Sequence, residues 1–185
     1  MRTRLSQPIQ ARVAFNSGRA HAAECARVRP IKMPIAFVKG DIFATDDLRA
    51  YAFAANVDGS MDAGIAIAVK KRWPAMAEAF AQRCASDEKL NPGETFVWTD
   101  GDVTLFALGV ADGDKKPSFS ALTRALKHML QLAAAAKIKR VGLSRISGVD
   151  WTRARKMLME VTVKQALRVE VFEQFVRSNA VAEEA

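Results

Sequence analysis

Cysteine is scarce in this chain of 185 residues, which contains only Cys25 and Cys84. Two cysteines cannot build the disulfide framework of a small secreted domain or supply a four-cysteine zinc site. Long apolar runs are also missing, because no stretch approaches the roughly 20 apolar residues of a membrane-spanning helix. We therefore expect a cytoplasmic protein that does not enter a membrane.

Histidine is equally scarce, with His21 near the N-terminus and His128 inside an expected helix. No cluster of metal-ligating residues and no nucleophile activated by histidine is visible in the sequence. We expect neither a metal ion nor another resident cofactor.

Basic residues are abundant, and 28 Lys and Arg against 20 Asp and Glu give a net charge of +8. Seven of these basic residues and only one acidic residue fall within residues 1–32, so the rest of the chain is nearly neutral. Clustered cations neutralise phosphates, so nucleic acid is an expected partner for residues 1–32 alone. Half of the residues are hydrophobic and 26% are charged, which indicates a globular domain with an appendage.

Residues 1–32 show no sustained apolar period and no apolar core of a secretory signal. Three interpretations remain open: a disordered basic arm, an organellar targeting peptide, and an artefact of the choice of start site, since Met33 directly precedes the first strand-like run. At the other end, residues 177–185 form an acidic, Ala-rich tail that we expect to fray.

From Met33 onward, strand-like and helix-like patterns alternate. Apolar runs predict strands at residues 35–38, 50–56, 95–99, 103–110, 140–146 and 168–172. Helical spacing predicts helices from 65 to 80 with a kink or break at Pro74, from 118 to 136, and from 151 to 165. Asp100-Gly101-Asp102 between two strands predicts an antiparallel hairpin. The expected fold of residues 33–176 is a three-layer α/β/α domain with a mixed, mostly parallel sheet of about six strands.

In such sheets, ligands bind in loops at the carboxyl ends of the strands. Residues 56–64, 111–117 and 147–150 form three loops of this kind. Gly59 and Gly64 precede a helix, whose free backbone N–H groups attract phosphate. The spacing matches neither the Walker loop nor the dinucleotide fingerprint. Such a loop also occurs as a plain tight turn.

Several motifs taken in order resemble a known family. They are Val38-Lys39-Gly40-Asp41-Ile42-Phe43, Phe53-Ala54-Ala55-Asn56, Met61-Asp62-Ala63-Gly64-Ile65-Ala66, Lys116-Pro117-Ser118-Phe119, and Arg145-Ile146-Ser147-Gly148 followed by Asp150-Trp151. Together they resemble macrodomains, the modules that bind ADP-ribose. The similarity is to the terminal ADP-ribose protein glycohydrolases and to the antitoxin partners of DNA ADP-ribosyltransferases, and it spans about residues 35–175.

The resemblance implies a set of ligand contacts. They are Asp41 at the adenine amino group with Ile42 beside it, Phe172 near adenine, Asn56 near the distal ribose, Ala63, Gly64 and Ile65 around the diphosphate, and Ser147, Gly148 and Val149 in a second phosphate loop. Structural alternatives stay open for three of them: a turn aspartate, a strand-end turn asparagine and a core phenylalanine.

The chain also departs from the family pattern. Asp62 stands where the family has glycine, and a carboxylate beside a diphosphate is repulsive unless it points away or binds a cation. The second phosphate loop is shorter than in the family, which leaves fewer backbone donors. The nucleophilic lysine of the hydrolytic members falls at about Val110, and Asp150 reads better as a helix cap than as the family's acid. If the protein is a hydrolase, Asn56 and Asp62 are therefore the catalytic candidates, acting through an activated water.

These observations predict a protein that binds ADP-ribose or an ADP-ribosylated macromolecule, with removal of ADP-ribose from a modified target as a further expectation. The alternative is a degenerate macrodomain fold that does not bind ADP-ribose and acts as an interaction or nucleic-acid-associated module. Binding through residues 1–32 would collapse with salt.

Overall fold

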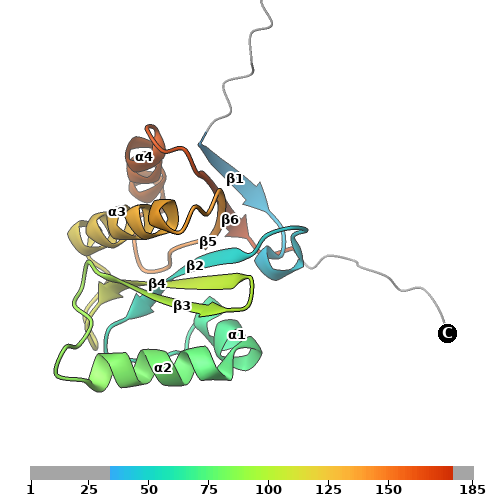
Figure 1. Ribbon diagram of the computed structural model, residues 1–185. Helices are drawn as coiled ribbons and strands as arrows, with labels where there is room; N and C mark the ends of the chain where they lie inside the picture. The colour runs from blue at the N-terminus through green and yellow to red at the C-terminus, as the bar shows by residue number, and fades with distance from the viewer. Residues whose placement is uncertain (1–33, 177–185) are drawn as a thin grey trace, which may run out of the picture. The chain divides into compact units, whose positions relative to one another are not determined.

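The computed structural model describes residues 34–176 (Figure 1). The predictions for residues 1–32 and 177–185 lie outside the described residues. The elements along the chain are β1 (Ile35–Lys39), the short 3-10 helix η1 (Ile42–Ala44), β2 (Ala50–Asn56), α1 (Ile65–Arg72), α2 (Pro74–Ala85), β3 (Thr95–Asp100), β4 (Val103–Ala111), α3 (Phe119–Ala135), β5 (Arg140–Ser144), α4 (Trp151–Thr162) and β6 (Arg168–Gln174).

These strands form one six-stranded sheet in the order β1-β6-β5-β2-β4-β3. Every neighbouring pair is parallel except β3 and β4, which form an antiparallel hairpin. Asp100 pairs with Val103, so the turn consists of Gly101 and Asp102, and Gly101 has a φ of +56°. The predicted mixed, mostly parallel sheet and its hairpin are confirmed.

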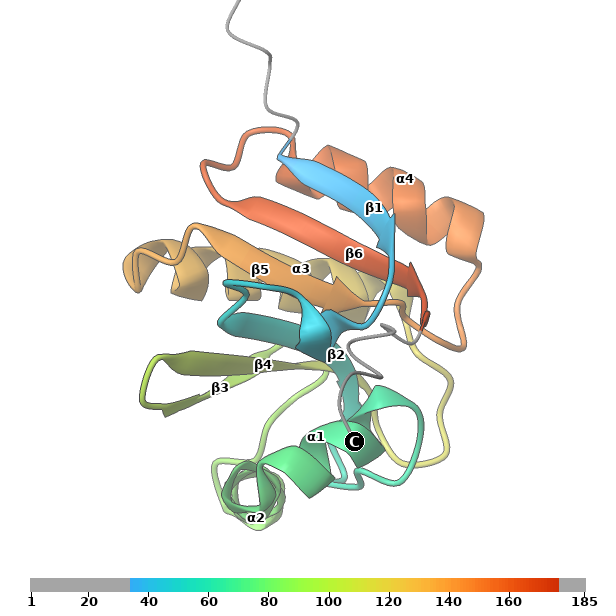
Figure 2. The ribbon, with the colours of Figure 1, turned by 90° about the vertical axis from the view of Figure 1, so that its right-hand side faces the viewer.

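Helices cover both faces of the sheet (Figures 1 and 2). α3 and α4 pack on one face, where Leu122, Leu126 and Met129 of α3 are fully buried against the strands. α1 and α2 pack on the other face, where Met76 and Phe80 of α2 are fully buried. The result is the predicted three-layer α/β/α arrangement, and it brings the carboxyl ends of the parallel strands to one edge.

The helix predicted from 65 to 80 is broken at the expected place. α1 ends at Arg72 and α2 begins at Pro74, because proline lacks the N–H that a continuous helix would need. The Trp73 N–H donates to the Val69 carbonyl oxygen at 2.8 Å and closes α1. Several boundaries differ from the predictions. α2 continues to Ala85 and β6 to Gln174, whereas β5 already ends at Ser144 and α4 at Thr162. Within residues 34–176, none of the helices is long and apolar enough to cross a lipid bilayer.

Candidate functional site

A cleft with two chambers lies at the carboxyl ends of the parallel strands. The larger chamber has a volume of about 760 Å³ and lies between the β1–η1 turn, α1 and the end of β6. The smaller chamber has a volume of about 210 Å³ and lies between the end of β2, the end of β4 and the loop after β5. Both chambers are lined by Gly64, Ile65, Ser144 and Arg145. These four residues mark the junction at which the two chambers adjoin.

The first wall of the larger chamber is the turn from β1 into η1. An Asp41 side-chain oxygen accepts a hydrogen bond from the Phe43 N–H at 2.9 Å, so Asp41 caps η1 while also lining the chamber. Ile42 is buried over β5, where Gly142 has no side chain. A Cβ atom at Gly142 would lie 3.1 Å from Ile42 and 2.6 Å from Leu48. The glycine therefore makes the room in which this turn sits.

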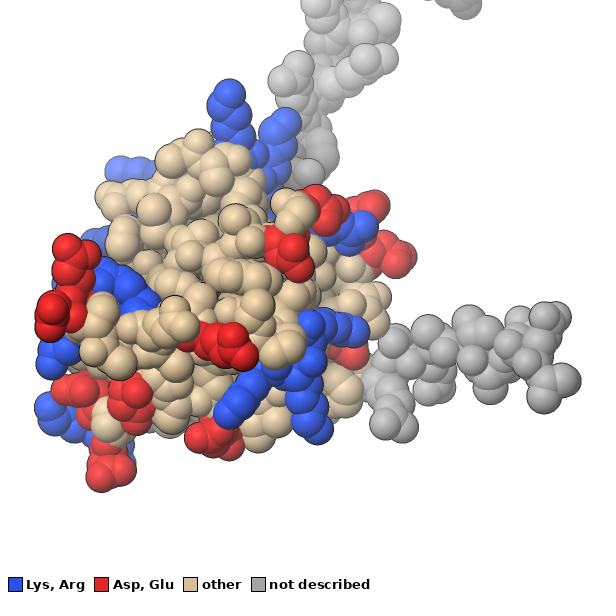
Figure 3. Space-filling view, turned by 60° about the horizontal axis from the view of Figure 1, so that its bottom comes forward, with Lys and Arg blue, Asp and Glu red and all other residues tan. Residues whose placement is uncertain are grey.

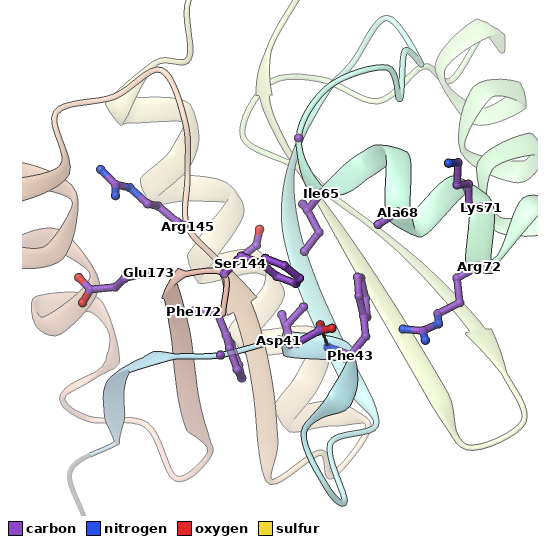
Figure 4. A pocket seen from close by; sticks show the side chains of 14 residues that line it. Asp41, Phe43, Ile65, Ala68, Lys71, Arg72, Ser144, Arg145, Phe172 and Glu173 are labelled. Carbon is purple, nitrogen blue, oxygen red and sulfur yellow. Dashed lines mark hydrogen bonds between the residues drawn. The ribbon is translucent and has the colours of Figure 1, made fainter. Parts of the chain in front are cut away.

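A second wall is aromatic and cationic. The rings of Phe43, Tyr51 and Trp73 lie 5.5–5.7 Å from one another, and the Arg72 guanidinium carbon lies 4.9 Å from the centre of the Phe43 ring. Figure 4 shows Arg72 reaching from the end of α1 toward Phe43. Burial raises the pKa of the Tyr51 phenol, which stays neutral and donates to the Leu48 carbonyl oxygen at 2.7 Å. A guanidinium held over an aromatic ring is a preorganised positive group at the rim of the chamber.

The opposite wall is formed by the end of β6 and the start of α4. Phe172 is nearly buried and lines the chamber, and Glu173 follows it. The Glu173 carboxylate accepts from the Trp151 indole N–H at 2.8 Å and from Arg155 at 2.9 Å. The Arg145 guanidinium carbon lies 5.2 Å from the centre of the Trp151 ring. Figure 4 places Arg145 and Glu173 on the side of the cavity opposite Lys71 and Arg72. The negative charge of Glu173 is thus already neutralised by a neighbour.

At the junction, the N-terminus of α1 faces the end of β5. Gly64 is the N-cap residue, with a φ of +56°, and no side chain caps the helix. The first turn of α1 contains no acidic residue. Ser144 is buried on the other side, and its Oγ atom has no hydrogen-bond partner among the described residues. The junction therefore presents free backbone N–H donors and an unpaired hydroxyl, which is a favourable arrangement for an anion.

Asn56 joins two loops beside the smaller chamber. Its side-chain N–H groups donate to the Gly113 carbonyl oxygen at 2.7 Å and to Asp58 at 2.9 Å, and its side-chain oxygen accepts from the Gly113 N–H at 2.9 Å. The amide thus fastens the loop before α1 to the loop before α3. This side chain lines the smaller chamber and also sets the position of two of its walls.

Most of the smaller chamber is apolar. Val110 is buried there, at the position where the family resemblance places a nucleophilic lysine. Among the described residues that line this chamber, Arg145 is the only one with an ionisable side chain. Lys115 lies on the exposed loop nearby and pairs with Asp112 at 3.2 Å. The described residues therefore supply no lysine or carboxylate to the wall of this chamber.

The structure brings together most of the residues singled out in the sequence. Asp41, Ile42, Gly64, Ile65 and Phe172 line the larger chamber, and Asn56, Ala63 and Ser147 line the smaller one. Their contacts with a ligand remain predictions.

Asp62, Gly148 and Val149 line neither of these two chambers. The Asp62 carboxylate is exposed and lies 3.2 Å from the Lys70 amine. Gly148 has a φ of +79° and packs closely on Pro117, and Val149 packs against the core. Asp150 accepts from the Arg153 N–H at 2.7 Å and caps α4 as expected.

Several residues of the cleft had no role in the sequence-based prediction, among them Phe43, Arg72, Ser144 and Arg145. Phe43 and Arg145 stand inside the quoted motifs, which was a usable signal. Arg72 and Ser144 have no such signal, because only the meeting of α1, η1 and β5 places them at the cleft. Within residues 34–176, no group of three or more His, Cys, Asp and Glu side chains is positioned to hold a metal ion.

Comparison with known proteins gives a consistent result, although no protein-family model matches the chain. The chain is 25% identical over 142 residues to the human protein ADP-ribose glycohydrolase OARD1. The match covers 75% of this chain and 90% of the human protein, and the bovine OARD1 protein matches with the same identity and coverage.

Solved macrodomain structures superpose on most of the chain. The macrodomain of Thermus aquaticus DarG has a TM-score of 0.69 at 18% identity, covering 75% of this chain and 97% of that structure. A Streptomyces coelicolor macrodomain protein has a TM-score of 0.64 at 24% identity, with coverages of 75% and 98%. Thermosipho africanus DarTG in complex with ADP-ribose has a TM-score of 0.67 at 16% identity, covering 77% of this chain and 41% of that one. This chain therefore has the macrodomain fold, and it is similar in sequence to ADP-ribose glycohydrolase OARD1 and in structure to the DarG macrodomain and to DarTG.

Proposed function

We propose that this protein binds ADP-ribose or ADP-ribosyl groups in the two-chamber cleft. The observation that carries the proposal is the junction, where a large and a small chamber meet at the uncapped N-terminus of α1. The larger chamber fits an adenosine, with Asp41 as acceptor and Ile42 and Phe172 as apolar surface. The smaller chamber fits a ribose, and the junction fits the diphosphate between them.

Electrostatics at the junction favours this orientation of the ligand. The partial positive charge of a helix N-terminus attracts a diphosphate, and the first turn of α1 lacks the carboxylate that would oppose it. Asp62 is the nearest departure from the family pattern, but its pairing with Lys70 offsets its charge outside the lining residues. The repulsion expected from the sequence is thereby reduced.

A pair of glycine substitutions tests the site. Gly64 and Gly101 both have a φ of +56°, and a Cβ atom at either position would meet no atom within 4 Å. Gly64→Glu places a carboxylate at the junction, whereas Gly101→Glu places it on the distant β3–β4 turn, and each adds a side chain at a positive φ. By calorimetric titration with ADP-ribose, we expect binding by the wild type and by Gly101→Glu and loss of binding by Gly64→Glu. Equal binding by the two variants would place the ligand elsewhere, and no binding by the wild type at millimolar ADP-ribose would reject the function.

The second candidate function is removal of ADP-ribose from a modified target. It is favoured by the 25% identity to a protein named as an ADP-ribose glycohydrolase. Because Val110 stands where the resemblance places the lysine, this version uses a water activated near Asn56 rather than a covalent lysine adduct. Asp62 takes part only if its exposed carboxylate leaves Lys70 and turns toward the cleft. Release of ADP-ribose from modified protein or DNA is the assay. Equal turnover by Asp62→Ala and wild type would contradict this mechanism.

The competing hypothesis of a degenerate binding site makes a different prediction. A protein that has lost ADP-ribose binding through Asp62 would regain it in Asp62→Gly. Micromolar binding by the wild type would count against such decay.

The remaining expectations also stay proposals. We place the protein in the cytoplasm because it has so few cysteines.

On the face in Figure 3, basic and acidic side chains are interspersed, so this face lacks the continuous positive charge that would attract nucleic acid. Nucleic-acid binding through residues 1–32 is tested by its salt dependence and by a chain starting at Met33, which also tests whether residues 33–176 fold as one domain.

A further inference from the structure

Ser144 is the last residue of β5 and lines both chambers of the cleft. Its relative exposure is 6%, and its Oγ atom is buried. In Figure 4, the side chain projects from the end of β5 on the side of Ile65. The hydroxyl is therefore held at the junction, opposite the N-terminus of α1.

This hydroxyl is an exception among the buried hydroxyls of the described residues. Thr95 and Thr162 are also buried, and each donates to a backbone carbonyl oxygen at 2.8 Å. Ser144 Oγ is the one buried side-chain polar atom in residues 34–176 without a hydrogen-bond partner. A buried polar group without a partner destabilises the protein, so it calls for a functional explanation.

We propose that the Ser144 hydroxyl donates a hydrogen bond to the diphosphate of the bound ligand and makes the cleft selective for diphosphate-containing ligands. This inference rests on the proposed function. A ligand that spans the two chambers passes the four residues they share, and the diphosphate is the part that joins adenosine to the distal ribose. A serine hydroxyl beside an anion acts as a donor, because the phosphate oxygens are acceptors only.

The inference also explains how a short phosphate loop is compensated. Residues 147–149 offer fewer backbone donors than the corresponding family loop, and Gly148 and Val149 lie outside the lining of both chambers. The Ser144 hydroxyl adds a donor from the strand end instead of the loop. Because this hydroxyl is buried and has no partner among the described residues, a hydrogen bond to phosphate is a larger net gain than one from an exposed, hydrated serine.

The test compares Ser144→Ala with wild type on two ligands. Calorimetry with ADP-ribose measures the diphosphate ligand, and an NMR titration with adenosine measures binding to the larger chamber alone. We expect Ser144→Ala to weaken ADP-ribose binding about tenfold or more, the loss typical of a hydrogen bond to a charged group, and to leave adenosine binding unchanged. The melting temperature of the free variant should equal or exceed that of wild type, because an unpaired buried hydroxyl has been removed.

Thr162→Val is the matched control, since it removes a buried hydroxyl that has a partner and lies away from the cleft. It should lower the melting temperature and leave ADP-ribose affinity unchanged. Unchanged ADP-ribose affinity in Ser144→Ala would overturn the inference, and so would an equal loss for ADP-ribose and adenosine, which indicates a change of chamber shape. Failure of the wild type to bind ADP-ribose would instead reject the proposed function itself.

Discussion

Asn56 offers a direct test of how the cleft is held open. Its side chain makes two hydrogen bonds with the Gly113 backbone, at 2.7 and 2.9 Å, and two with Asp58, one to the carboxylate at 2.9 Å and a long one from the N–H at 3.5 Å. Asn56→Ala removes all four and frees the loop before α1 from the loop before α3. The alanine fits the strand end, so the change removes a fastening and adds no clash.

The size of the effect follows from these contacts. A partly exposed hydrogen bond contributes about 0.5–1.5 kcal/mol net, and the bonds here share one side chain, so we expect a total loss of about 1–2 kcal/mol. For a chain of this size, each kcal/mol lowers the melting temperature by about 2–4 °C. Asn56→Ala should therefore melt roughly 2–8 °C below wild type. Its affinity for ADP-ribose should fall, while its affinity for adenosine, which needs only the larger chamber, should not change.

Thermal unfolding followed by circular dichroism, together with the two ligand titrations, measures these effects. Asn91→Ala is the control, because the Asn91 side chain donates only one weak hydrogen bond, at 3.4 Å to the Lys89 carbonyl oxygen. Its melting temperature should lie close to that of wild type. If the melting temperature of Asn56→Ala equals that of Asn91→Ala, the Asn56 amide does not fasten the loops. Parallel losses of ADP-ribose and adenosine affinity would refute the assignment of Asn56 to the smaller chamber.

Two further predictions concern the framework beneath the cleft. Gly142→Ala forces a methyl group against Ile42, so it should cost about 1–3 kcal/mol and weaken adenosine binding, as calorimetry and thermal melts would show. Burial raises the pKa of Glu170, but hydrogen bonds from Arg140 and Arg168, each at 2.7 Å, outweigh this and leave its pKa below the ordinary value. The stabilisation is therefore present at neutral pH and lost as the pH falls through that lowered pKa. Glu170→Gln should lose about 2 kcal/mol at pH 7 and much less at acid pH, as measured by denaturant unfolding.

Each of these two predictions has an outcome that contradicts it. Wild-type stability in Gly142→Ala would mean that the β1–η1 turn can shift without cost. A constant difference between Glu170→Gln and wild type from neutral to acid pH would show that the ionised carboxylate is not the stabilising form.

Local pattern predicted the architecture well, because strand alternation, helical spacing and turn chemistry act over a few residues. Pro74 breaks the helix as its missing N–H requires, and Gly101 supplies the positive φ of the hairpin turn. The ordered motifs also indicated the cleft, since the carboxyl ends of parallel strands converge at one edge. Element ends were less predictable. The last hydrogen bond from this strand to β6 is the one from the Arg145 N–H to the Phe172 carbonyl oxygen, and the assigned strand β5 ends at Ser144.

The charge of Asp62 shows what a pattern alone leaves open. From the motif alone, Asp62 belongs to a phosphate-binding loop, where its carboxylate is expected either to repel the diphosphate or to take part in hydrolysis. In the folded chain, the Asp62 carboxylate is exposed, pairs with Lys70 eight residues later and lines neither chamber. Which way a side chain points depends on partners from other elements, and these are set only when the elements pack.

The amino-acid sequence by itself determined the three-layer α/β/α fold, the hairpin, the helix break and the macrodomain-like order of motifs. Tertiary structure decided the chemistry of the cleft: the unpaired hydroxyl of Ser144, the guanidinium of Arg72 over Phe43, the loop fastening by Asn56 and the apolar Val110 in the smaller chamber. The physical reason is that the residues of the cleft lie far apart along the sequence. Local preferences act between neighbours along the chain, whereas Ser144 and Gly64 become neighbours only when β5 and α1 pack at the same edge of the sheet.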